Sequence, residues 1–210
     1  MSEARDSERP AVPRRERRRL EMRSRILEAA LQRFREAGYE GTTVAEICEA
    51  ADVAYGTFFN HFPTKLDLLR AIVDESLLEL ALRVEGLAKA PGPTREKLGP
   101  LFELLTRSAR EFGPGQRDLV GQMVALGHQE LPADRERRLH AIFRGFLEAG
   151  VARGDLRADE LDGLTEIVLG SYTSLMLGWV HFDDYPVGAR AQTAARLLER
   201  ILAHPPEEDP

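Results

Sequence analysis

The stretch from Thr42 to Lys65, TTVAEICEAADVAYGTFFNHFPTK, constrains the fold more than any other part of the chain. Thr43 is followed three residues later by Glu46, the spacing of a capping box, which predicts that a helix starts here. The apolar residues that follow recur at helical spacing and predict one buried face: Val44, Ile47, Cys48 and Ala51. Asp52 stands where this run stops, and Asp tolerates the left-handed conformation that a sharp turn needs.

A second short helix is expected directly after this turn. Three residues can anchor it on the first helix: Val53, Phe58 and Phe62. The face on the other side then carries Tyr55, Gly56, Asn60 and His61. Pro63 ends the helix, and Thr64 with Asp67 has the spacing of a further helix start. Two short helices joined by a tight turn fit a helix-turn-helix, in which the second helix enters the DNA major groove.

The same stretch resembles the DNA-binding segment of the TetR (tetracycline-repressor) family of bacterial transcription regulators. That segment reads roughly T-x-x-x-I-A, then A-G-V-S-x-x-T-L-Y-x-H-F and K-x-x-L. The matching residues lie in one register over about the first third of the chain: Thr43, Ile47, Ala51, Val53, Gly56, Thr57, His61, Phe62, Lys65 and Leu68. The resemblance implies an all-α protein that binds DNA as a homodimer and responds to a small molecule.

Four positions depart from the family pattern. The turn glycine of the family is Asp52, and the serine that caps its recognition helix is Ala54, a loss that costs roughly 1 kcal/mol. The phosphate-binding tyrosine is Phe59, which lacks the hydroxyl, and Cys48 replaces a small apolar residue. These changes affect particular contacts and leave the DNA-binding interpretation in place.

Composition is consistent with a globular protein, at 43% hydrophobic and 30% charged residues. No apolar run is long enough for a bilayer, and the N-terminus lacks the apolar core of a secretory signal, so we expect a cytoplasmic location and no membrane partner. Cys48 is the only cysteine, which excludes an intrachain disulfide. We interpret it as a packing residue, with a redox sensor as the alternative.

The net charge of −6 is unevenly distributed. Residues 1–65 carry twelve Lys and Arg against eleven Asp and Glu, whereas the remainder carries seventeen against twenty-four. Between Arg14 and Arg25 there are seven arginines against two glutamates. Positive charge therefore lies beside the helix-turn-helix, where phosphate neutralisation would be needed.

Helical periodicity continues to the end of the chain, so the predicted fold class is all-α, with about nine helices. We divide the chain into a disordered arm at 1–13, the three-helix DNA-binding domain at 14–65, a helical effector-binding and dimerisation domain at 66–204, and a disordered tail at 205–210. Arginines of the arm could reach a minor groove or the backbone, or the arm could only aid solubility.

Thirteen residues are the expected DNA contacts. Tyr55 and Gly56 start the recognition helix, where side chains meet base edges. The full set is Arg14, Arg15, Arg18, Thr43, Val44, Ala45, Tyr55, Gly56, Thr57, Phe59, Asn60, His61 and Lys65. Those expected on phosphates include Thr43, Thr57, His61 and Lys65. The partner is double-stranded DNA with a palindromic operator.

The second domain offers two weaker groups of candidates. Small residues on two late helices suggest a dimer interface of the kind that the family resemblance implies, with ordinary internal packing as the alternative: Gly163, Gly170, Ser171, Gly178, Ala191, Ala195 and Leu198. The family resemblance implies a pocket for an unknown small-molecule effector. The candidates to line it are aromatic, methionine and polar residues, although ordinary core packing uses the same types: Phe102, Met123, His128, Phe143, Phe146, Tyr172, Met176 and Trp179.

An enzyme is disfavoured, because no phosphate-cradling glycine loop, nucleophile elbow or dinucleotide fingerprint is present. The histidines are too scattered for a metal site, and we expect no cofactor. The prediction is therefore a ligand-responsive transcriptional regulator, most simply a repressor. The alternative is a helical protein that keeps the motif but binds a protein partner or DNA without sequence preference.

Overall fold

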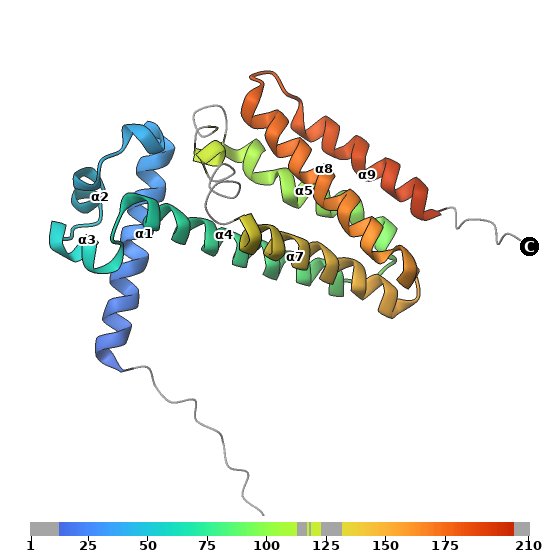
Figure 1. Cartoon of the computed structure of the whole chain (residues 1–210), viewed down its shortest axis with the longest axis horizontal. Helices are drawn as coiled ribbons and strands as arrows, with labels where there is room; N and C mark the ends of the chain where they lie inside the picture. The colour runs from blue at the N-terminus through green and yellow to red at the C-terminus, as the bar shows by residue number, and fades with distance from the viewer. Residues whose placement is uncertain (1–12, 113–116, 118, 123–131, 204–210) are drawn as a thin grey trace, which may run out of the picture.

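The computed structural model describes residues 13–112, 117, 119–122 and 132–203, and within these ranges every regular element is a helix (Figure 1). The all-α prediction is confirmed. The helices are α1 (Arg14–Gly41), α2 (Val44–Ala50), α3 (Tyr55–His61), α4 (Lys65–Lys89), α5 (Thr94–Phe112), α7 (Pro132–Arg153), a 3-10 turn at Ala158–Glu160, α8 (Leu161–His181) and α9 (Val187–Ala203).

Helices α1 to α3 and the start of α4 form a small N-terminal domain (Figure 1). Gly38 has φ 76° and interrupts the helical backbone, although the last turn of α1 extends to Gly41. The largest side chains of this core have almost no exposed surface: Ile26, Phe34, Ile47, Phe58, Leu68 and Leu69.

Helix α4 joins two separate cores. Leu69 and Ile72 pack in the N-terminal core, whereas Val73, Leu77 and Val84 pack in the core of the second bundle. The two cores therefore meet between Ile72 and Val73, inside one continuous helix. Helix α4 thus contributes side chains to both cores.

The second bundle consists of α4, α5, α7, α8 and α9 (Figure 1). Helix α5 packs on α9, α4 lies beside α7, and α7 packs on α8. Helix α5 runs from Thr94 to Phe112 with Pro100 inside it. None of the helices in the described ranges is long and apolar enough to cross a bilayer.

A short segment between α5 and α7 touches both cores. Residues 117 and 119–122 are helical. Leu119 is buried in the N-terminal core, and Val120 packs against the second core. Arg117 pairs with Asp183, in the turn between α8 and α9. The predicted arm and tail lie outside the described residues, apart from Pro13.

Candidate DNA-binding surface

A reciprocal capping box starts α2, as the sequence predicts. The backbone N–H of Thr43 donates to Oε2 of Glu46 at 2.7 Å, and the N–H of Glu46 donates to the Thr43 hydroxyl at 3.3 Å. Hydrogen bonds from the Thr43 hydroxyl and backbone lower the pKa of the Glu46 carboxyl. The ionised carboxylate also suits the positive end of the helix dipole.

The turn between α2 and α3 depends on Asp52, which has φ 51° and is the only non-glycine residue with positive φ among those described. Arg25 of α1 holds this turn through its guanidinium group. Its guanidinium donates to the carbonyl oxygens of Ala51 and Asp52 and pairs with the Asp52 carboxylate at 3.6 Å. The angle between the two helices is thus fixed by α1 as well as by local conformation.

Helix α3 is anchored on one side and open on the other. Phe58 and Phe62 are buried in the N-terminal core, which holds the helix in place. Tyr55 is 56% exposed, and its ring meets the ring of Phe59 edge-on with centroids 5.0 Å apart. A Cβ atom built on Gly56 would meet nothing within 4 Å, so this turn of backbone is open to a ligand. No side chain caps the helix at Ala54, as predicted.

Positive charge lies beside α3. His61, at the end of the helix, has its pKa lowered by burial and by the nearby Arg19 and Arg23 of α1. These arginines hold His61 in the neutral form over a wider pH range than usual. A DNA phosphate in this place would be attracted by both arginines.

Lys65 is placed differently from the expectation. Its ammonium group turns inward and donates to the backbone carbonyl oxygens of Tyr39 at 2.8 Å and Thr42 at 3.0 Å. The amine thereby satisfies carbonyls at the end of α1, where helices leave such groups without partners. In this geometry Lys65 stabilises the domain, and the expected phosphate contact would require the side chain to turn outward.

Comparison with known proteins agrees with this geometry. Residues 26–72 match the family described as bacterial regulatory proteins, tetR family. They span the second half of α1, the two short helices and the start of α4. Residues 26–72 thus form a tetR-family segment within the chain.

Relatives in the TetR family include regulators of several kinds. The repressor KstR of Mycolicibacterium smegmatis is 32% identical over 42% of this chain and 43% of its own length, so that match spans less than half of the relative. The regulator AcrR of Shigella flexneri is 28% identical over 90% of this chain and 94% of its own. The crystal structure of FadR from Thermus thermophilus, a repressor in complex with lauroyl-CoA, is 27% identical over 90% of this chain and 98% of that one, with a TM-score of 0.66.

Most of the predicted DNA contacts lie at the surface of the TetR-family domain. The exposed ones are Arg14, Arg15, Arg18, Thr43, Ala45, Tyr55, Gly56, Phe59 and Asn60. Four are half-buried: Val44, Thr57, His61 and Lys65. Val44 packs against the N-terminal core, so its part is structural. The others, Lys65 apart, remain candidates for contact with DNA.

The predicted effector residues come together in the core of the second bundle. Those with little exposed surface are Phe102, Phe143, Phe146, Met176 and Trp179. Tyr172 packs against this core with its ring edge-on to Phe143, at 5.7 Å between centroids. Met123 and His128 lie outside the described residues. The two interpretations, effector contact and ordinary packing, both remain open for the buried group.

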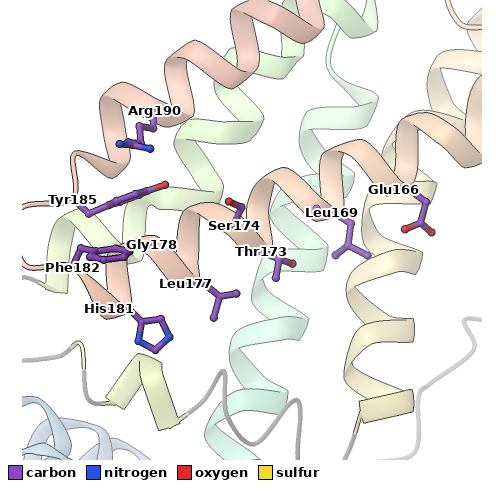
Figure 2. Close-up of a pocket in the computed structure, with 11 residues that line it drawn as sticks. Glu166, Leu169, Thr173, Ser174, Leu177, Gly178, His181, Phe182, Tyr185 and Arg190 are labelled. Carbon is purple, nitrogen blue, oxygen red and sulfur yellow. The ribbon is translucent and has the colours of Figure 1, made fainter.

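Four of the predicted dimer residues require correction. Ala191, Ala195 and Leu198 face inward to the core, so they cannot meet a second chain. Gly178 is covered by its own chain, because a Cβ there would lie only 2.3 Å from the ring of Tyr185 (Figure 2). Tyr185 in turn stacks on Phe182, and the Arg190 guanidinium lies 4.6 Å from its centroid. The three residues of α9 were expected at a dimer interface, whereas the structure places them in the core.

The exposed faces of α8 and α9 carry apolar residues that the sequence analysis missed. The large exposed side chains are Ile167 of α8, Leu197 and Ile201 of α9, and Phe182 directly after the end of α8. The predicted Gly163 and Gly170 are also exposed, and Ser171 is half-buried. Figure 2 shows Leu177, Thr173 and Leu169 along one side of α8, in the lining of a hollow of about 760 Å³. The sequence signal for the exposed residues of α9 was that they are apolar but do not share the helical spacing of its core residues.

Proposed function

We propose that this protein is a repressor that binds a palindromic operator as a homodimer and is released by a small molecule. The observation that carries the proposal is the construction of α3. Its aromatic residues Phe58 and Phe62 are buried, while Tyr55, Gly56 and Asn60 face outward from a helix-turn-helix fixed by Arg25. Such a helix is placed to enter a major groove and meet base edges.

Dimerisation through α8 and α9 would follow from their exposed faces. Leu197 and Ile201 are one turn apart on α9, and Ile167 lies on α8 near the small residue Gly170. Exposed apolar groups of this kind mark an interface between proteins. A twofold dimer presents two recognition helices, and helix-turn-helix dimers read half-sites roughly 34–36 Å apart. A palindromic operator therefore accompanies the dimer.

Effector control would act through α4. Two adjacent carboxylates on this helix bind opposite parts of the molecule: Asp74 pairs with Arg138 of α7 at 2.6 Å, and Glu75 pairs with Arg23 of α1 at 2.7 Å. A ligand that favours a different packing of α7 on α4 would move the N-terminal domain through the same helix. The ligand can shift the equilibrium between the two packings only by the difference in its affinity for them.

Acyl-CoA thioesters are the first effector class to test. Support comes from the likeness to FadR of Thermus thermophilus, whose structure holds lauroyl-CoA, and from the apolar core of the second bundle. The acyl chain would replace part of the packing around Phe102 and Phe143. The proposed role is that of a regulator that acts on DNA in the bacterial cytoplasm.

The deciding experiment is selection of bound sequences from a randomised duplex library at physiological salt. Recovery of one palindrome supports the proposal and supplies the probe on which acyl-CoA esters of different lengths are tested for release. Weak, salt-sensitive binding with no recovered motif would favour the alternative, a protein-partner or non-specific DNA-binding role. Tyr55→Ala should change the recovered motif, because this residue lies at the start of the recognition helix.

A further inference from the structure

Helices α4 and α7 lie side by side along the second bundle (Figure 1). A groove of about 360 Å³ follows the seam between them. Its lining shares no residue with the hollow beside α8, and Phe102 and Phe143, around which we place the acyl-CoA chain, are not part of it. Most of the lining residues are small or apolar: Ala81, Val84, Glu85, Ala88, Lys89, Ala141, Ile142, Gly145, Phe146 and Ala149.

Gly145 keeps the middle of this groove open. It lies in the interior of α7, where glycine is less favourable than alanine, and a Cβ built there would meet no neighbouring atom within 4 Å. Val84 and Phe146 line the groove although they are almost fully buried, so they form its apolar floor. Leu78 and Leu82 of α4, at 63% and 61% exposed, extend the apolar surface beside it. Apolar surface of this kind in contact with solvent marks a binding site.

The groove offers few partners for hydrogen bonds, which restricts what can occupy it. Among the described residues that line it, only Glu85 and Lys89 have polar side chains. A peptide strand in the groove would leave backbone N–H and C=O groups without partners, which is costly. An α-helix, about 10–12 Å across, is too wide for the seam between two helices in contact. A single alkyl chain has neither difficulty, because it is narrow and has no polar groups.

The groove ends beside a group of positively charged side chains. The carbonyl oxygen of Ala88, a lining residue, accepts hydrogen bonds from Nζ of Lys97 at 3.0 Å and from Arg153 at 2.9 Å. Lys97 is almost fully buried; burial and Arg153 lower its pKa, although Asp155 acts in the opposite sense. Three cations thus meet two carboxylates, which leaves one positive charge unbalanced within this group: Lys89, Lys97 and Arg153 against Glu85 and Asp155.

We propose that this groove binds a single-chain fatty acid, with the alkyl chain between α4 and α7 and the carboxylate at the Lys89 end. The chain displaces water from Gly145 and the apolar residues around it. The single negative charge of the head balances the one positive charge left by the cationic group. Because the ligand touches both helices, it stabilises their present packing. The groove binds it whether or not α3 binds DNA.

Calorimetric titration of the full chain with sodium dodecanoate, below its micelle concentration, tests the site. Gly145→Leu places a side chain in the groove without displacing a neighbouring atom, so it should weaken binding by about tenfold or more. Gly86→Leu is the matched control, because Gly86 is exposed on α4, has equally open space and lines no part of the groove. The control should bind like the wild type. Leucine favours helix more than glycine does, so neither variant should melt below the wild type.

Two further series test the chain and the head separately. From octanoate to dodecanoate, affinity should increase by up to about fourfold for each methylene that is buried. Dodecyltrimethylammonium has the same chain and the opposite charge, so it should bind more weakly than dodecanoate. Lys89→Met should weaken dodecanoate by about two- to fivefold, the effect of an exposed ion pair, and should not weaken dodecyltrimethylammonium.

The outcomes assign the groove to one occupant. A wild-type protein that does not bind dodecanoate would overturn the inference, and so would equal affinity in Gly145→Leu, which would place the ligand elsewhere. Equal binding of the two amphiphiles would overturn the role of the cationic group. A change of oligomeric state in Gly145→Leu, with no dodecanoate bound by the wild type, would assign the seam to a second copy of the chain. Selection of operator DNA is a separate measurement, so failure of the repressor proposal would leave these results unchanged.

Discussion

The ammonium nitrogen of Lys65 lies 2.8 Å from the carbonyl oxygen of Tyr39 and 4.3 Å from the centroid of the same tyrosine ring. One side chain therefore joins the start of α4 to the end of α1. Lys65→Met keeps the aliphatic stem and removes the charge-assisted hydrogen bonds, each worth about 1.5–3 kcal/mol. We expect a clear loss of stability of the N-terminal domain in urea unfolding. The exposed Lys89→Met should change little.

The same variant decides where Lys65 points in the complex with DNA. If the wild-type amine stays on the Tyr39 and Thr42 carbonyls in the complex, Lys65→Met should bind DNA with the wild-type salt slope. A decrease of about one would show instead that the side chain turns outward to a phosphate on binding. Urea unfolding and salt titration of the same preparation give both answers.

Asp52 offers a test of the helix-turn-helix turn. Its φ of 51° suits glycine better than any residue with a side chain. Asp52→Gly should therefore preserve or raise thermal stability, because the exposed ion pair with Arg25 contributes little. Asp52→Val should lower stability by about 1–2 kcal/mol, because a β-branched residue is strained in the left-handed region. Equal melting temperatures for both variants would contradict this account.

Local and non-local features differ in how well the sequence predicted them. The capping box of Thr43 and Glu46 and the left-handed Asp52 involve neighbours in the chain, so short motifs were sufficient. The inward turn of Lys65 depends on carbonyls more than twenty residues away, which no local pattern records. Likewise, periodicity found the stripe containing Ala195, but not whether that stripe faces α5 or a second chain.

His61 predicts how stability depends on pH. Burial, Arg19 and Arg23 lower its pKa below the ordinary value of 6.5, so the unfolded chain takes up this proton at a higher pH than the folded one. The contribution of His61 to stability is constant above that pH and decreases as pH falls from 6.5 to the folded pKa. Thermal melting of wild type and His61→Gln should diverge in this window, with the variant less sensitive to pH.

A separate pH range serves as the internal control for His61. The lowered pKa of Glu46 makes its stabilisation disappear only as pH falls below 4.5, whereas the effect of His61 begins as pH falls below 6.5. A second control, Arg19→Ala, should bring the His61 pKa closer to normal and reduce the difference between the two curves. Identical pH profiles for wild type and His61→Gln would contradict a pKa of His61 that is lowered by burial, Arg19 and Arg23.

A substitution at Gly56 can distinguish a role in folding from a role in DNA binding. No atom lies within 4 Å of a Cβ built there, so a side chain fits the free protein. Gly56→Ala should stabilise α3 by up to about 1 kcal/mol, because alanine favours helix more than glycine does. If DNA approaches this turn of backbone closely, the same variant should bind the operator more weakly. Opposite shifts in melting temperature and affinity would assign Gly56 to contact; parallel shifts would assign it to folding alone.

The two faces of α9 give the sharpest test of the dimer. Leu197 is 52% exposed and Ile201 57%, whereas Ala195 is 2% exposed. Leu197→Glu with Ile201→Glu should leave the fold intact and convert a dimer to monomers in sedimentation or light scattering, because a charge in the interface is costly. Ala195→Glu should instead unfold the second bundle, since it places a charge in the core against α5. Operator affinity should decrease in the folded monomer, because each chain then reads one half-site without its partner. A double variant that remains dimeric would place the interface elsewhere and leave the apolar face of α8 and α9 for another partner.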